Sequence, residues 1–186
     1  PETAYAPAEA DLRVGFYAPE GYRLAVTAGD SGEGLGDSFA LGRLAIDPAG
    51  SGTSLPNPGT YRFEDRFRLL GYAYDRRLLG PSDDLSLTLY WEAMQDESGT
   101  IDVQVRLLDE QGRVLFAEQR PLSPMAANKV TLEGHTIPAD PDRPAGYYTV
   151  QVSLEDPEAE RRLQLVADDG RWLDDKLLLS AVRQTD

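Results

Sequence analysis

LSLTLYWEA (Leu85–Ala93) and IDVQVRLLDEQGRVLF (Ile101–Phe116) are the stretches of this sequence that decide its fold. In both, apolar and polar residues alternate. Successive side chains of a strand point to opposite faces, so this pattern predicts strands with one buried face and one solvated face. The DEQG segment (Asp109–Gly112) is expected to turn the chain, because Gly112 adopts positive φ without steric cost. The two stretches therefore predict an antiparallel meander with Trp91 in its core.

Outward from this pair, the same alternation recurs along most of the chain. It predicts strands at 12–16, 22–28 and 148–154. Further strands are predicted at 39–46, 130–137, 163–166 and 177–182, and residues 61–74 begin the main block. Gly71 marks a bulge or a close backbone approach within its strand. Tyr148 stands just after a turn and at the head of a strand, which is the position of a tyrosine corner. Helical periodicity is weak, so we predict an all-β fold, an antiparallel Ig-like or jelly-roll-like β-sandwich with extra N-terminal strands.

The composition divides the chain into three parts. Residues 1–47 form an N-terminal lead-in with accessory strands, of which 1–10 are rich in Ala, Pro and Glu and read as disordered. Residues 48–60 form a Pro/Gly/Ser-rich linker, and residues 61–186 form the sandwich. The strands within 12–46 either join the sandwich or form a small separate sheet. The chain opens without Met and without the segments of a signal peptide, so we expect it to be part of a longer protein.

Charge and composition exclude several function classes. The 186 residues carry a formal net charge of −14, which would repel the phosphate backbone of a nucleic acid and an anionic membrane surface. The chain has no cysteine, which rules out disulfides, thiolate nucleophiles and zinc–thiolate sites. No apolar run approaches the ~20 residues that span a bilayer, so we expect no direct membrane insertion.

Several segments, taken in order, resemble a known kind of domain. They are FRLLGYAYD (Phe67–Asp75), LSLTLYWEA, IDVQVRLLDEQGRVLFAEQRPL (Ile101–Leu122), GYYTVQVSLED (Gly146–Asp156) and LLLSAV (Leu177–Val182). Together they resemble the extracytoplasmic β-sandwich region of large bacterial membrane glycosyltransferases of the mannosyltransferase-like kind. The resemblance covers roughly 61–186, and more weakly 12–47. It implies a non-catalytic module in the cell envelope, whose transferase chemistry would belong to membrane segments outside this chain. It carries over no catalytic residue.

Several aromatic residues are candidates for carbohydrate binding. Trp172 lies in the polar loop DDGRWLDD (Asp168–Asp175), where its face is available to stack on a sugar ring. The alternative is that Trp172 caps the open end of the sandwich. Tyr90 is out of phase with the core of its strand, so Tyr90 and Tyr72, together with Tyr74, are candidates for an exposed aromatic platform. Aromatic residues also favour strands for packing reasons alone.

The remaining polar groups predict neither a catalytic nor a metal site. His135, the single histidine, has no nucleophile motif beside it and is expected to be an ordinary strand or edge residue. The acidic pairs at strand ends, such as Asp168–Asp169, lack the spacing of a calcium loop and indicate solvated turns. We therefore predict no cofactor.

Three functions stay open at this point. The leading hypothesis is a non-catalytic, extracytoplasmic interaction module of a larger bacterial envelope protein, with a glycan or a protein as its partner. The second is a carbohydrate-binding module that uses Trp172, Tyr90 and Tyr72. The third, a hydrolase, would require a cleft with converging acids or with His135 beside a serine. The interaction module predicts no deep polar pocket and no clustered carboxylates with strongly shifted pKa values.

Overall fold

The computed structural model describes residues 7–29, 31–46, 55–96 and 100–185, which form strands, turns and loops without a helix. Within these ranges no helix is long and apolar enough to cross a membrane. The chain divides into two compact units. The larger contains residues 47–186 together with 1–7, and the smaller is Ala8–Ile46.

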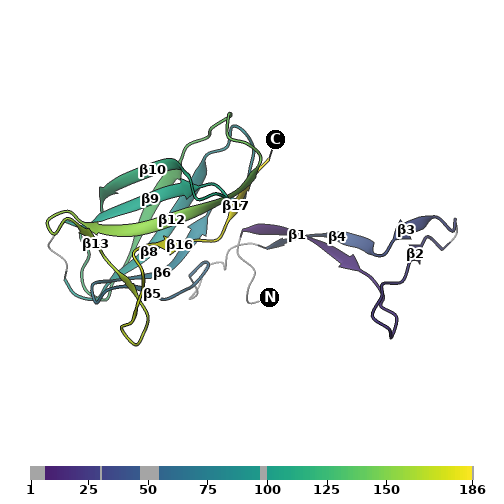
Figure 1. The fold of residues 1–186 in the computed structure, drawn as a ribbon, viewed down its shortest axis with the longest axis horizontal. Helices are drawn as coiled ribbons and strands as arrows, with labels where there is room; N and C mark the ends of the chain where they lie inside the picture. Colours follow the sequence, from purple (N-terminus) through teal and green to yellow (C-terminus); the bar gives the residue numbers. More distant parts are fainter. Residues whose placement is uncertain (1–6, 30, 47–54, 97–99, 186) are drawn as a thin grey trace. The chain divides into compact units, whose positions relative to one another are not determined.

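The larger unit contains two sheets. The first has the strand order β10 (Val114–Pro121), β9 (Asp102–Leu108), β12 (Gly146–Asp156), β17 (Val182–Gln184) and β7 (Leu78–Leu79), with β13 (Arg161–Arg162) and β16 (Leu177–Leu178) also paired to β12. All of its pairs are antiparallel except β17 with β7. In Figure 1, β10, β9 and β12 lie side by side as one layer of the domain.

The second sheet is fully antiparallel and forms the opposite layer. Its order is β11 (Val130–Ile137), β8 (Leu85–Ala93), β6 (Phe67–Tyr74), β5 (Tyr61–Phe63), β14 (Leu165–Val166) and β15 (Trp172–Asp174). The strands β8 and β11 have the bounds that the sequence predicts. Strand β9 begins at Asp102, one residue after the predicted start, and the predicted last strand at 177–182 is divided into β16 and β17.

One apolar core fills the space between the sheets. The inward residues of β8 are fully buried, and Trp91 contacts Phe63 with ring centroids 5.6 Å apart. The buried residues of β9 and β12 belong to the same core cluster as those of β8. Apolar faces of two sheets packed against each other make a β-sandwich, which confirms the predicted fold class. The core position of Trp91 is likewise confirmed.

Two local predictions are also confirmed. The register of β6 on β8 shifts between Leu69 and Gly71, which is a bulge. A Cβ atom at Gly71 would lie 2.7 Å from the carbonyl oxygen of Pro56, so the close backbone approach requires glycine. The hydroxyl of Tyr148 donates to the carbonyl oxygen of Pro144 at 2.5 Å, which is the tyrosine corner.

The smaller unit contains two separate two-stranded sheets. In one, β1 (Ala8–Val14) pairs antiparallel with β4 (Phe39–Ile46), and in the other β2 (Val26–Thr27) pairs with β3 (Gly34–Gly36). The prediction of a disordered lead-in over 1–10 is wrong for residues 8–10, because they belong to β1. The strand predicted at 22–28 is only the short β2.

The predicted linker is described only from residue 55 onward, since 47–54 lie outside the described residues. Its described end hydrogen-bonds to β6. Gly59 N–H donates to Leu70 O at 3.1 Å, and Tyr72 N–H donates to Pro56 O at 3.2 Å. Residues 55–60 therefore run along the sandwich as part of it.

Candidate functional site

The three predicted carbohydrate-binding residues do not share one surface. Trp172, on the edge strand β15, is 60% exposed, whereas Tyr90 is half-buried on the outer face of β8. The strands β6, β5 and β14 separate β8 from β15. At about 4.8 Å per strand, this separation puts the backbones of Tyr90 and Trp172 about 19 Å apart across the sheet. One sugar ring does not reach both.

The prediction that Tyr72 and Tyr74 lie on an exposed platform is wrong, because both are buried. The Tyr72 side chain is 3% exposed and packs against Tyr74, with ring centroids 5.5 Å apart. Both hydroxyls bind the segment between β16 and β17. Tyr72 Oη lies 2.7 Å from Ser180 Oγ, and Tyr74 donates to the Ser180 carbonyl oxygen at 3.1 Å. The two tyrosines therefore join the sheets from inside the core. The bulge before Gly71 is the physical reason, because it changes which side chains of β6 face inward.

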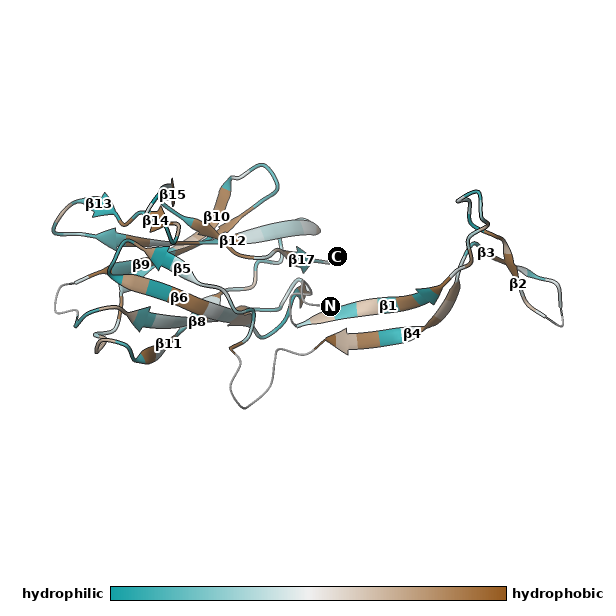
Figure 2. Cartoon of the chain, turned by 90° about the horizontal axis from the view of Figure 1, so that it is seen from below, coloured by the Kyte–Doolittle hydropathy of each residue, from teal (hydrophilic) through white to brown (hydrophobic). Residues whose placement is uncertain are grey.

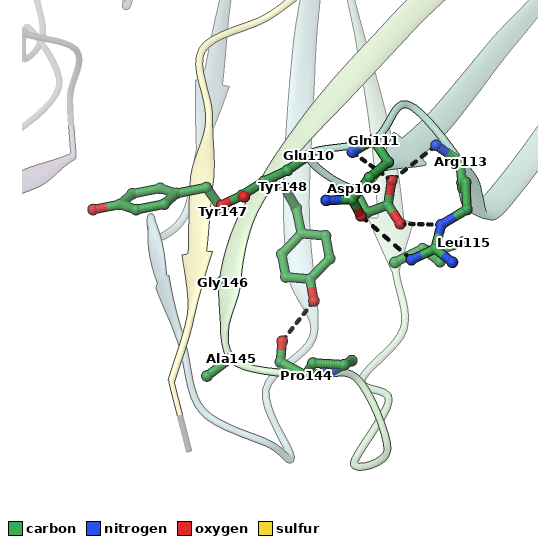
Figure 3. Close-up of a pocket in the computed structure, with 10 residues that line it drawn as sticks. All are labelled: Asp109, Glu110, Gln111, Arg113, Leu115, Pro144, Ala145, Gly146, Tyr147 and Tyr148. Atoms are coloured by element: carbon green, nitrogen blue, oxygen red, sulfur yellow. Dashed lines mark hydrogen bonds and ion pairs between the residues drawn. The ribbon is translucent and has the colours of Figure 1, made fainter.

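A shallow pocket of about 310 Å³ lies at the end of the sandwich that carries the tyrosine corner (Figure 3). Asp109 forms one wall, where it accepts hydrogen bonds from the Gln111 and Arg113 backbone N–H groups, both at 2.9 Å. Arg113 also donates to Asp109 Oδ2 at 2.6 Å. Because these bonds hold the carboxylate within its own turn, the pKa of Asp109 is lowered even though burial acts against it. Figure 3 shows the exposed Tyr147 pointing to the opposite side of β12 from Tyr148.

A cluster of charged side chains lies between the edge strands of the two sheets. His135 on β11 is 3% exposed, and its Nδ1 lies 2.8 Å from Glu118 Oε2 on β10. Because a carboxylate only accepts hydrogen bonds, this contact places the proton on Nδ1 and leaves Nε2 without one in the neutral ring. His135 Nε2 then faces Glu133 Oε2 at 4.0 Å, and neither atom has a hydrogen-bond partner among the described residues. Arg120 completes the cluster, with Nε 3.5 Å from Glu133 Oε1.

Burial shifts the pKa values of two members of this cluster in opposite directions. It raises the pKa of Glu133 to about 7, against the pull of the Arg120 charge, and Glu118 adds to the rise. It lowers the pKa of His135, although the hydrogen bond that the ring donates to Glu118 acts in the other direction. Both shifts favour the neutral form of the side chain, because burial disfavours its charged form.

This cluster has one of the two features that the hydrolase hypothesis requires, namely converging acids, and the interaction-module hypothesis does not predict it. The other feature, an open cleft, is opposed by the burial of Glu133, which is 7% exposed. Among the described residues His135 has no hydroxyl partner, because its two ring nitrogens face Glu118 and Glu133. The contacts of His135 with Glu118 and of Glu133 with Arg120 join β11 to β10 along one side of the sandwich. Sequence spacing did not indicate them.

Two carboxylates of the acidic loop around Trp172 form ion pairs with residues outside the loop. Lys176 Nζ lies 2.9 Å from Asp174 Oδ1, and Arg162 Nη1 lies 3.2 Å from Asp175 Oδ2. In the described part of the chain, no group of three or more histidine or acidic side chains is arranged to hold a metal ion.

The β1–β4 ribbon of the smaller unit has an exposed apolar face. Four cross-strand pairs of the antiparallel register lie on that face. They are Ala8 with Ile46, Ala10 with Leu44, Leu12 with Gly42, and Val14 with Phe39. Glu9, Asp11 and Arg43 form ion pairs on the other face at 3.4 and 3.6 Å. Figure 2 shows hydrophobic and hydrophilic residues alternating along β1, whereas β4 is mostly hydrophobic. The sequence alternation at 12–16 indicated an apolar face, but not that it stays uncovered.

No protein family model matches the sequence, and no curated protein matches it. Among solved structures, the C-terminal domain of Wzt is similar at 12% identity over 69% of this chain and 82% of that chain, with a TM-score of 0.48. The CARDB domain of the PF1109 protein from Pyrococcus furiosus, solved with di-metal ions, shares 8% identity over 74% of this chain and 100% of its own, with a TM-score of 0.41. A Niemann-Pick type C2 protein from the Japanese carpenter ant shares 7% identity over 76% and 100%, with a TM-score of 0.39. These similarities concern the β-rich fold alone.

Proposed function

We propose that this chain is a non-catalytic, extracytoplasmic β-sandwich interaction module of a larger bacterial envelope protein. The sequence resemblance favours a membrane glycosyltransferase as that parent protein. The observation that carries the proposal is the exposed apolar face of the β1–β4 ribbon. Every residue of β1 after Ala8, and every residue of β4 before Ile46, is exposed. An apolar face of this extent is typical of a protein contact surface.

Physical chemistry gives a reason why this face should bind something. A two-stranded ribbon without a core is at best marginally stable in water, since its hydrogen bonds and cross-strand pairs barely offset the entropy of ordering it. The rest of the smaller unit adds exposed Phe16, Tyr17, Tyr22 and Leu24. Covering the apolar face removes that surface from water and stabilises the ribbon at the same time.

Photo-cross-linking of the parent protein in living cells tests this proposal. A photo-reactive phenylalanine analogue at position 44 would lie on the apolar face, and the same analogue at position 45 would lie on the polar face. We expect covalent protein adducts from position 44 and far fewer from position 45. No adduct at either position, or equal yields at both, would contradict an interaction surface on this ribbon.

Carbohydrate binding is the second candidate, and the exposure of Trp172 favours it. An exposed indole beside paired carboxylates offers a stacking face next to hydrogen-bonding groups. A glycan array with the purified chain tests it, using Trp172→Ala and, as a matched exposed aromatic elsewhere, Tyr147→Ala. Binding that Trp172→Ala removes and Tyr147→Ala retains would place the site on β15. An array without binding by the unmodified chain would exclude it for the glycans tested.

A further inference from the structure

The apolar face of the β1–β4 ribbon, defined by its four cross-strand pairs, has a regular relief. Three of the four pairs join a small residue to a large one, and the large member changes strand along the ribbon. Ile46 and Leu44 project from β4 beside Ala8 and Ala10, whereas Leu12 projects from β1 beside Gly42. Projections therefore lie on β4 in the first two pairs and on β1 in the third, and both members of the fourth pair, Val14 and Phe39, are large. Such a surface interdigitates with another surface of the same relief, which is how packed sheet layers fill space.

A two-fold axis brings projections opposite hollows. Let the axis lie between the two ribbons, perpendicular to their strands and level with the gap between the second and third pairs. Each strand then faces the same strand of the second copy, which runs in the reverse direction. Leu12 then meets the hollow at Ala10 of the second copy, and Leu44 meets the hollow at Gly42. At the ends of the contact Val14 meets Ala8, whereas Phe39 lies opposite the large Ile46. An isologous contact of this kind uses one patch on both molecules and needs no other partner.

Charge does not oppose this contact, although the whole chain carries −14. Within β1 and β4 the charged residues are Glu9, Asp11, Arg13 and Arg43, so the ribbon strands are neutral. All four belong to the polar face by alternation, and Arg43 pairs with both acids there. The apolar face carries no charge to be buried.

The area is sufficient for a specific contact. The large residues Leu12, Val14, Phe39 and Leu44 are 40–53% exposed, and Leu41 in the bulge of β4 is 56% exposed. With the alanines and Ile46, two such faces together would bury on the order of 1,000 Å², which is the lower limit for a biological interface. A contact of this size predicts a reversible dimer whose population depends on concentration.

We infer that the partner of this face is a second copy of the chain, and that two ribbons pack apolar face to apolar face in a two-fold dimer. This inference rests on the proposed interaction function, for which it names the partner. It assigns the contact to the ribbon and leaves the sandwich free to bind other molecules.

Sedimentation velocity of the whole chain over a hundredfold range of concentration tests the inference. We expect a monomer–dimer equilibrium. In Leu44→Asp each dimer would bury two unpaired carboxylates, so its dissociation constant should rise at least ~100-fold. Ala45→Asp adds the same group to the polar face of the same strand and should dimerise as the unmodified chain does.

Leu44→Asp could abolish the dimer by unfolding the ribbon, so a second, less disruptive substitution is needed. Leu12→Cys introduces the only thiol of the chain. A short bis-maleimide should link it into covalent dimers, whereas Arg13→Cys, whose thiol lies on the polar face away from the contact, should not be cross-linked. An unmodified chain that stays monomeric at every concentration would overturn the second copy as partner. Adducts from position 44 to a different protein would then show that the interaction function stands without it. A dimer that Leu44→Asp leaves intact would also overturn the inference, because the contact would lie elsewhere.

Discussion

Replacing Glu133 by glutamine is expected to stabilise the protein above neutral pH and to change its stability little in acid. Glutamine keeps the shape of the side chain, replaces one carboxyl oxygen by an amide NH2 group and does not ionise. Glu133 lies on the inner side of the edge strand β11, where its carboxyl is almost wholly covered. Arg120 is 3.5 Å away on β10, and His135 Nε2 is 4.0 Å away on β11. Ionisation there costs free energy that the Arg120 charge only partly offsets.

The size of the effect follows from the pKa of Glu133, which is about 7 in the folded protein against an ordinary value of 4.5. Below pH 4.5 the carboxyl is protonated in the folded and unfolded states, so it imposes no penalty. As the pH rises, the unfolded chain ionises first, and the folded state loses stability until its own carboxyl ionises near pH 7. Above that pH the loss is complete and amounts to about 3 kcal/mol. This is a large share of the stability of an ordinary domain.

His135 contributes a pH dependence of the opposite sign. Its pKa is lowered in the folded state, so the unfolded chain binds a proton more readily and stability falls as the pH drops below about 6.5. Glu118 and Arg120 face the same ring, and both remain in the variant. The histidine contribution is therefore present in both proteins, and the difference between them reports Glu133.

Urea unfolding at pH 4.5, 6 and 8.5 measures the difference. We expect the free energy of unfolding of Glu133→Gln to exceed that of the unmodified protein by about 2–3 kcal/mol at pH 8.5 and to match it at pH 4.5. Glu158→Gln, the same change on an exposed carboxyl, should have no effect at either pH. Equal stabilities at pH 8.5, or a variant that is less stable there, would refute a carboxyl destabilised by burial.

Three further substitutions test the bulge at Gly71, the tyrosine corner at Tyr148 and the core position of Trp91 by urea or thermal unfolding. Gly71→Ala would place a methyl group 2.7 Å from the Pro56 carbonyl oxygen and should cost about 1–3 kcal/mol; an unchanged midpoint would show that the bulge relaxes freely. Tyr148→Phe removes the hydrogen bond to Pro144 and should cost about 1 kcal/mol, which a stability equal to the unmodified protein would contradict. Trp91→Ala empties a fully buried site and should cost about 3–5 kcal/mol, so a loss under 1 kcal/mol would remove Trp91 from the core.

The strand β8 shows how far sequence reasoning reaches. Its predicted and observed bounds agree at Leu85 and Ala93, and its buried and solvated positions follow the alternation of its side chains. This strand is regular, and one of its faces lies wholly against the core. Under those conditions the period of two determines both the strand and its orientation.

The misplacement of Tyr72 shows where the same reasoning fails. Gly71 was correctly expected to bulge the strand, but one extra residue also reverses the side of every residue that follows it. Tyr90, on the unbulged neighbour β8, kept its predicted orientation with partial exposure. The direction in which a bulge displaces a strand depends on its hydrogen-bonding partner, and a single sequence does not reveal that partner.

The contact of His135 with Glu118 was beyond sequence reasoning for a related cause. The two residues lie on edge strands of different sheets, so their distance depends on how the sheets pack and on two separate registers. One signal was present: Glu133 and His135 are in phase with the buried Ile137 on β11. Two ionisable residues on the inward face of a strand require partners, because an unpaired buried charge is costly.

The ribbon and the central strand β8 carry the same kind of pattern with different outcomes. Leu12 and Val14 alternate with charged residues as regularly as Leu87 and Leu89 alternate with polar ones, yet the first pair is exposed and the second is buried. Alternation states only that one face gains free energy by leaving water, and it does not say which surface supplies the cover. In β8 the cover is the opposite sheet of the same domain. On the ribbon the corresponding residues are exposed and the face that they form carries no charge, which is why we propose that a second copy of the chain covers it.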